Sequence, residues 1–174
     1  MRSLSELSDI GGWIPMRVAA GSEAAGVEAI SCALTMARTA EGEPLRSLTV
    51  CSPRSSEVVR RFASLLSEGI GAQGRPELRV EMTMPVFPSI EAVKSADRAD
   101  LVVLVCEYRR TARSEAEAAV HRLKQFSGKP VMPVLWGVPE AWESQPESGR
   151  RTKSFFARWQ AFIFSSLGMS TQEV

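Results

Sequence analysis

A short polar turn at residues 52–56 contains groups that could bind an anion. Ser52 and Pro53 interrupt an apolar run, and Arg54, Ser55 and Ser56 follow immediately before a helical pattern. A guanidinium, two hydroxyls and the N–H groups at the start of a helix would converge there, and such groups hold phosphates in proteins. The same serines would equally cap the helix, and simple capping is the interpretation that we favour.

A strand that leads into a helix through such a turn is also the framework of a phosphate-binding loop. That loop needs glycines for close backbone approach, a lysine that reaches the phosphates, and a Ser or Thr for magnesium. No glycine lies between Gly42 and Gly69, and Val58, Val59 and Arg60 stand where Gly, Lys and Ser would be required. We therefore expect no catalytic residues of the ATPase type, no cofactor and no metal site.

A second polar group follows the most hydrophobic run of the chain, which spans residues 101–106. Such a run is typical of a central parallel strand, and ligands of open α/β sheets bind beyond the carboxyl ends of such strands. A solvated turn is the simpler alternative. We take residues from both turns as one candidate face for an anion or a partner: Arg54, Ser55, Ser56, Glu107, Arg109 and Arg110.

The elements that must position these residues follow from hydrophobic spacing. Apolar residues at helical or strand spacing predict helices alternating with short strands, which is the pattern of a parallel sheet covered by helices. The expected helices are residues 22–38, 56–70, 89–99, 111–127 (or from Ser114) and 154–167, and the expected strands are 48–51, 78–82, 101–106 and 131–136. The expected fold is therefore an α/β three-layer sandwich with a mainly parallel sheet of four to five strands and helices on both faces.

The length and charge of the chain limit the classes of function. With 174 residues and a formal net charge of +1, the chain suits one domain and has no overall attraction to nucleic acid. We expect an irregular arm over residues 1–21 and one domain over residues 22–174. No apolar run is long enough for a transmembrane segment, and Cys32, Cys51 and Cys106 suit reduced thiols in the cytoplasm.

Two stretches, residues 28–57 and 96–134, resemble the bacterial tyrosine kinases of capsule and exopolysaccharide synthesis, a branch of the P-loop ATPases. The similarity lies in the helix before the sheet, the strand that ends in Ser52-Pro53, and a later strand with a basic turn. Because Val58, Val59 and Arg60 replace the phosphate-binding residues, the resemblance implies a shortened, non-catalytic relative. It implies a regulator or scaffold that binds a membrane polysaccharide co-polymerase or a related protein at the inner face of the membrane, with self-association left open.

An alternative interpretation rests on Glu115 and Glu117, which lie early in the helix after the central strand. A catalytic glutamate in this region resembles that of TIR-type NAD hydrolases, and the run Gly128 to Val134 is similar to a TIR strand. The simpler explanation is that acids at the start of a helix interact favourably with its dipole. His121 is the only histidine and has no neighbouring nucleophile in sequence, so a Ser-His or Cys-His mechanism is not supported.

Overall fold

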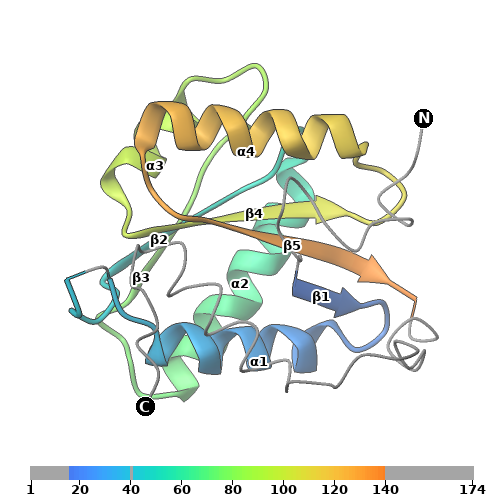
Figure 1. The fold of residues 1–174 in the computed structure, drawn as a ribbon. Helices are drawn as coiled ribbons and strands as arrows, with labels where there is room; N and C mark the ends of the chain where they lie inside the picture. Colours follow the sequence, from blue (N-terminus) through green and yellow to red (C-terminus); the bar gives the residue numbers. More distant parts are fainter. Residues whose placement is uncertain (1–15, 40, 140–174) are drawn as a thin grey trace, which may run out of the picture.

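The computed structural model describes residues 16–39 and 41–139. They form a five-stranded sheet in the order β1-β5-β4-β2-β3, in which every neighbouring pair of strands is parallel (Figure 1). In chain order the elements are β1 (Met16–Ala19), α1 (Glu23–Met36), β2 (Ser47–Cys51), α2 (Ser56–Ala72), β3 (Arg79–Met82), α3 (Glu91–Arg98), β4 (Leu101–Glu107), α4 (Arg113–Ser127) and β5 (Val131–Val138).

Helices cover both faces of the sheet. Helices α1 and α2 pack against each other on one face, and α3 and α4 pack against each other on the other face (Figure 1). This arrangement confirms the predicted α/β three-layer sandwich and its parallel sheet. No helix in the described ranges combines the length and apolar character that crossing a membrane requires.

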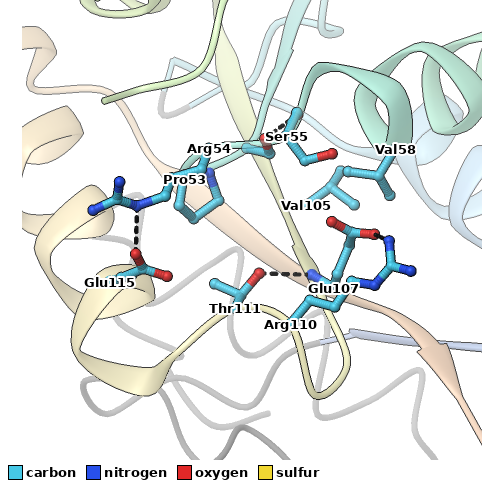
Figure 2. A pocket seen from close by; sticks show the side chains of 10 residues that line it. Pro53, Arg54, Ser55, Val58, Val105, Glu107, Arg110, Thr111 and Glu115 are labelled. Carbon is cyan, nitrogen blue, oxygen red and sulfur yellow. Dashed lines mark hydrogen bonds and ion pairs between the residues drawn. The ribbon is translucent and has the colours of Figure 1, made fainter. Parts of the chain in front are cut away.

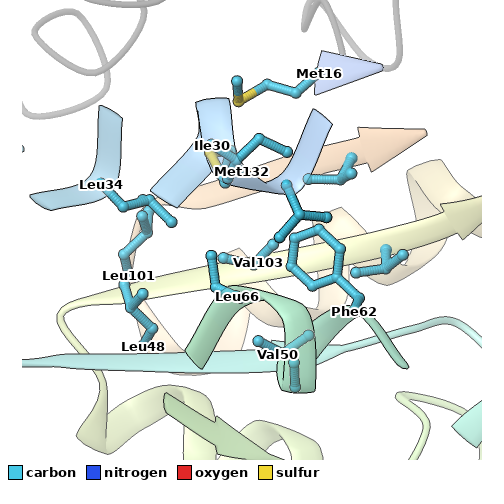
Figure 3. Packing of buried hydrophobic residues seen from close by; sticks show 14 of the residues in the cluster. Met16, Ile30, Leu34, Leu48, Val50, Phe62, Leu66, Leu101, Val103 and Met132 are labelled. Carbon is cyan, nitrogen blue, oxygen red and sulfur yellow. The ribbon is translucent and has the colours of Figure 1, made fainter. Parts of the chain in front are cut away.

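Strand β4 lies at the centre of the sheet and is buried on both faces. Val103 and Val105 belong to the core beneath α1 and α2, whereas Val102 and Leu104 belong to the core beneath α3 and α4. The first core also contains Phe62 and its apolar neighbours (Figure 3). Alternate residues of a strand point to opposite faces, so a strand between two cores needs an unbroken apolar run. The prediction of a central strand at residues 101–106 is confirmed.

Helix α2 crosses α1 at a glycine. A Cβ atom placed on Gly69 would lie 2.3 Å from the Oγ atom of Ser31, closer than two such atoms can approach. Ser31 is itself buried and donates a hydrogen bond of 2.8 Å to the carbonyl of Val27. The absence of a side chain at Gly69 therefore sets how closely the two helices approach each other.

An aspartate joins the amino ends of β2 and β4. The carboxylate of Asp100 accepts hydrogen bonds from the backbone N–H groups of Arg46, at 2.8 Å, and Ser47, at 2.9 Å. The Asp100 N–H in turn donates to the carbonyl of Ser47 at 3.0 Å. These bonds fix the register of the two strands whose opposite ends form the candidate site.

Two predictions about local structure are wrong. Residues 16–19 were assigned to an irregular arm, but they form strand β1, which pairs with β5 at the edge of the sheet. Helix α2 was expected to end near Ile70 in a glycine-rich loop, but it continues through Gly71 to Ala72. The rest of the proposed arm and the helix expected at residues 154–167 lie outside the described residues.

Candidate functional site

A pocket lies at the carboxyl ends of β2 and β4. From β2 the chain continues through α2 to β3 on one side, whereas from β4 it continues through α4 to β5 on the other side. The two paths diverge between these strands, and open α/β sheets bind ligands at such a point. The cavity volume is about 60 Å³. Side chains from the turns after both strands surround it (Figure 2). It is lined by Ser52, Pro53, Arg54, Ser55, Val58, Val105, Glu107, Arg110, Thr111 and Glu115.

The turn after β2 is held by its own serines. Ser52 is buried, and its hydroxyl donates a hydrogen bond to the carbonyl of Ser55. Ser55 occupies the position before α2, but its side chain makes no capping hydrogen bond. Side-chain capping of α2 by Ser55, which the sequence suggested, is therefore not made. Ser56 is the first residue of α2 and does not line the pocket.

The turn after β4 closes tightly on Thr111. The Thr111 hydroxyl accepts a hydrogen bond of 2.9 Å from the N–H of Glu107, and the Thr111 N–H donates to the carbonyl of Glu107 at 3.0 Å. Arg109 makes the turn with a φ of 62°, in the left-handed region that non-glycine residues seldom adopt. Its guanidinium lies over the ring of Tyr108, and it does not line the pocket.

Each charged group of the pocket has an oppositely charged neighbour. Arg54 pairs with Glu115 across the pocket, and a nitrogen of Arg110 lies 3.4 Å from a carboxylate oxygen of Glu107 (Figure 2). The lining thus contains two guanidinium groups and two carboxylates, whose formal charges cancel. The pocket therefore offers an anion no net positive charge from its side chains.

Glu115 and Glu117, the alternative catalytic residues, have different surroundings. Glu115 lines the pocket, and in addition to its pair with Arg54 it accepts a hydrogen bond of 3.3 Å from the N–H of Ala112. That bond satisfies a donor at the start of α4, which is a structural role. Glu117 does not line the pocket, and its carboxylate lies 2.7 Å from the guanidinium of Arg113 one helical turn earlier. Only Glu115 is placed to act on a bound molecule.

Apolar side chains occupy the part of the site where a phosphate-binding loop would place polar groups. Val58 lines the pocket at the start of α2 (Figure 2), and Val59 is buried against the sheet with 2% of its surface exposed. Neither side chain can bind a phosphate or a magnesium ion. Within residues 16–39 and 41–139, no three metal-binding side chains lie close enough together to hold an ion.

Two thiols lie behind the pocket, in β2 and β4. Cys51 and Cys106 are both fully buried. Burial raises the pKa of the Cys106 thiol to about 12, with a smaller contribution from the nearby carboxylate of Glu115. Burial likewise raises the pKa of Cys51. Because the thiolate is the reactive form, neither cysteine can serve as a nucleophile near neutral pH.

The structure brings together five of the eight candidate residues: Arg54, Ser55, Glu107, Arg110 and Glu115. Ser56, Arg109 and Glu117 lie outside the pocket. Thr111 also lines the pocket, although its place in the sequence indicated only the start of a helix. Its position four residues after Glu107 was the available signal, because a threonine there can bond back to the end of the strand. His121 is exposed on α4 and also lies outside the pocket.

The fold and the pocket define a doubly wound α/β protein. Its small pocket, whose side-chain charges cancel, lies between β2 and β4, where the chain connections diverge to the two sides of the sheet. No protein-family model matches the chain, and no curated protein is significantly similar to it in sequence.

Proposed function

We propose that the chain is a non-catalytic, kinase-like regulator or scaffold in exopolysaccharide biosynthesis or export, and that it binds a protein partner through the rim of this pocket. The observation that carries the proposal is the mutual pairing of the pocket's charged groups, Arg54 with Glu115 and Arg110 with Glu107. A catalytic site keeps an acid, base or nucleophile available for substrate. Here the charged groups bind one another, and the apolar side chain of Val58 lines the wall beside them.

The exposed guanidinium groups suit recognition of a protein. The side chains of Arg54 and Arg110 are 71% and 79% exposed, whereas their acidic partners Glu115 and Glu107 lie deeper. Arginine is enriched among the residues that contribute most to protein interfaces, because its planar group forms several hydrogen bonds at once. The proposed partner is a membrane polysaccharide co-polymerase or a related component, which would place the protein at the inner face of the membrane. Carboxylates on such a partner would form ion pairs with Arg54 and Arg110 in place of Glu115 and Glu107.

Calorimetric titration with the cytoplasmic segment of the co-polymerase produced by the same cell tests this proposal. We expect the double variant Arg54→Ala, Arg110→Ala to bind at least about tenfold more weakly, since each interface arginine contributes on the order of 1 kcal/mol or more. Arg60→Ala is the matched control, because Arg60 is exposed on α2, the helix that follows the Arg54 turn, and does not line the pocket. Equal loss of binding in the control, or normal polysaccharide output in a strain that lacks the protein, would contradict the proposal.

A second titration tests the non-catalytic part of the proposal. The purified protein should not bind magnesium-ATP, because the turn at residues 52–56 contains neither a glycine for close backbone approach nor a lysine for the phosphates. Magnesium-dependent binding of ATP at micromolar concentrations would show that the pocket is a working nucleotide site.

The position of Glu115 favours one alternative, an α/β enzyme that uses a nucleotide, such as a TIR-like NAD hydrolase. Glu115 is the one alternative catalytic residue that lines the pocket, and it faces the end of the central strand. Prolonged incubation of the purified protein with NAD separates the two candidates. Consumption of NAD that disappears in a Glu115→Gln variant would establish the enzyme, whereas unchanged NAD supports the scaffold.

A further inference from the structure

Strand β3 forms one edge of the sheet. In the described part of the chain it pairs with β2 alone. The N–H of Arg79 donates to the carbonyl of Arg46 at 2.9 Å, and the N–H of Thr83 donates to the carbonyl of Val50 at 3.1 Å. Backbone groups alternate in direction along a strand. The N–H and C=O groups of Val80 and Met82 therefore point towards the outer edge.

Opposite charges stand on either side of the middle of this strand. Arg79 and Glu81 are both exposed and flank Val80. Neither side chain has an ion pair or a hydrogen bond with any residue in the described ranges. Val80 packs on the opposite face, against the core beneath α1 and α2. Arg79 and Glu81 thus share one face of an edge whose backbone is available.

From this arrangement we infer that β3 is the site at which two copies of this chain associate, antiparallel about a two-fold axis at Val80. In that register Val80 lies opposite Val80 of the second copy, and Arg79 lies opposite Glu81 of the second copy. Each Val80 presents both backbone groups outward, as the hydrogen-bonded type of antiparallel pair requires. The two Arg79–Glu81 pairs are then of the closer, non-hydrogen-bonded type, in which opposite charges stabilise the pairing.

The apolar residues of the strand fit the same register. Met82, the last residue of β3, and Met84, just after it, are 56% and 58% exposed, so apolar surface adjoins the free edge of the strand. The two-fold axis places Met82 opposite Leu78 of the second copy, and Leu78 is buried at the start of the strand. The N–H of Leu78 already donates to the carbonyl of Arg75, at 3.1 Å. The carbonyl of Leu78 can still accept a hydrogen bond from the N–H of Met82 in the second copy. Association would join the two sheets into one continuous sheet.

Charge reversal tests the inference directly, because the register predicts which changes cancel. Analytical ultracentrifugation of the full chain should show a dimer. Glu81→Arg and Arg79→Glu should each weaken the dimer at least about tenfold, since like charges then face each other in both pairs. The double variant Arg79→Glu, Glu81→Arg should regain wild-type affinity. An equimolar mixture of the two single variants should form a mixed dimer, because every pair again has opposite charges.

A backbone variant tests the hydrogen bonds separately from the charges. Met82→Pro removes an N–H group that points to the outer edge and makes no hydrogen bond to β2. The domain should therefore stay folded, while the dimer weakens because it loses a hydrogen bond between the two copies. Circular dichroism and thermal melting confirm the fold of each variant. A monomeric wild type at all concentrations would overturn the inference, whether the edge stays free or residues 140–174 occupy it. A dimer that persists in both single charge variants would also overturn it.

Discussion

The guanidinium of Arg54, in the turn after β2, forms an ion pair with the carboxylate of Glu115, in the first turn of α4. The two residues are 61 positions apart in sequence, and their pairing bridges the point at which the chain diverges to the two sides of the sheet. The Arg54 side chain is 71% exposed and that of Glu115 is 28% exposed. The pair therefore neutralises the rim of the pocket while staying within reach of water and of a partner.

Exposure of Arg54 limits what this pair contributes to folding. A double-mutant cycle with Arg54→Ala and Glu115→Gln should give a coupling free energy of about 1 kcal/mol or less, because water and salt screen such a pair. Urea unfolding of the four proteins measures it, and Arg113→Ala with Glu117→Gln provides a matched cycle within α4. A coupling energy well above that of the control cycle would mean that the pair is a structural clamp.

Replacement of both acids of α4 separates a scaffold from an enzyme in cells. Glu115→Gln with Glu117→Gln should lower stability by about 0.3 to 1 kcal/mol for each interaction with the helix dipole and leave polysaccharide output close to normal. Loss of a catalytic acid or base would instead reduce a rate by about 100-fold or more. Output from a complemented deletion strain is the measurement, with protein abundance as its control.

The two glycines within α2 should respond to alanine in opposite directions. Gly69→Ala should destabilise the domain by roughly 1 to 3 kcal/mol, because its new methyl group meets Ser31 in the crossing with α1. Gly71→Ala should stabilise it by roughly 0.5 to 1 kcal/mol, because a Cβ atom there meets nothing within 4 Å and alanine favours the helix. Midpoints of thermal or urea unfolding compare the two. Equal effects would show that helix propensity alone decides both.

A charge in the central strand should abolish folding. Val103 is fully buried in β4, and an unpaired carboxylate there costs several kcal/mol, against a total domain stability of about 5 to 15 kcal/mol. We expect Val103→Asp to lose its cooperative thermal transition. Val103→Ala, which loses roughly 2 kcal/mol of apolar burial, should retain that transition at a lower temperature. A cooperative, monodisperse Val103→Asp protein would refute the position of β4.

The buried thiols should make the domain sensitive to alkali. Folding raises the pKa of Cys106 to about 12 and raises that of Cys51, whereas both ionise near 8.5 when unfolded. Above about pH 8.5 the thiols of the unfolded state lose their protons while those of the folded state keep them. The free energy of unfolding is therefore undiminished below about pH 8.5. It falls as pH rises towards 12, by about 1.4 kcal/mol per pH unit for each thiol. Urea unfolding at several pH values measures the slope. The double variant Cys51→Ala, Cys106→Ala should have a shallower slope, and an unchanged slope would assign the effect to other groups.

The elements that were predicted correctly are those with strong local signals. The unbroken apolar run of β4 and the helical spacing of α2 each determine an element without reference to distant residues. Strand β1 was missed because it is only four residues long and its partner, β5, lies at the far end of the described chain. The continuation of α2 past Ile70 to Ala72 was missed because Gly69 and Gly71 favour a helix end locally. Gly69 is present instead because α2 packs closely on Ser31 of α1, and no local sequence pattern reveals that contact.

The sequence predicts where the candidate site lies, but it does not predict which of the site's charged side chains form ion pairs. Both turns follow the carboxyl ends of strands, so the rule for parallel sheets brings Arg54 and Glu107 to the same edge. Which side chains then meet depends on the path of α4 across the sheet. That path pairs Arg54 with Glu115 and turns Glu117 away. The spacing of residues in sequence carries no information about such a crossing.

The pairing of β1 with β5 has a consequence for synthesis of the protein in the cell. Ala19 leaves the ribosome long before Val131, and at about 5 to 20 residues per second the delay is roughly 5 to 20 seconds. Until β5 emerges, the backbone groups of β1 lack their native hydrogen-bond partners, and Met16 and Val18 lack neighbours such as Val134. The nascent chain must therefore carry β1 without its partner strand while residues 20–130 are made, and a ribosome-associated chaperone would have its greatest effect in that interval.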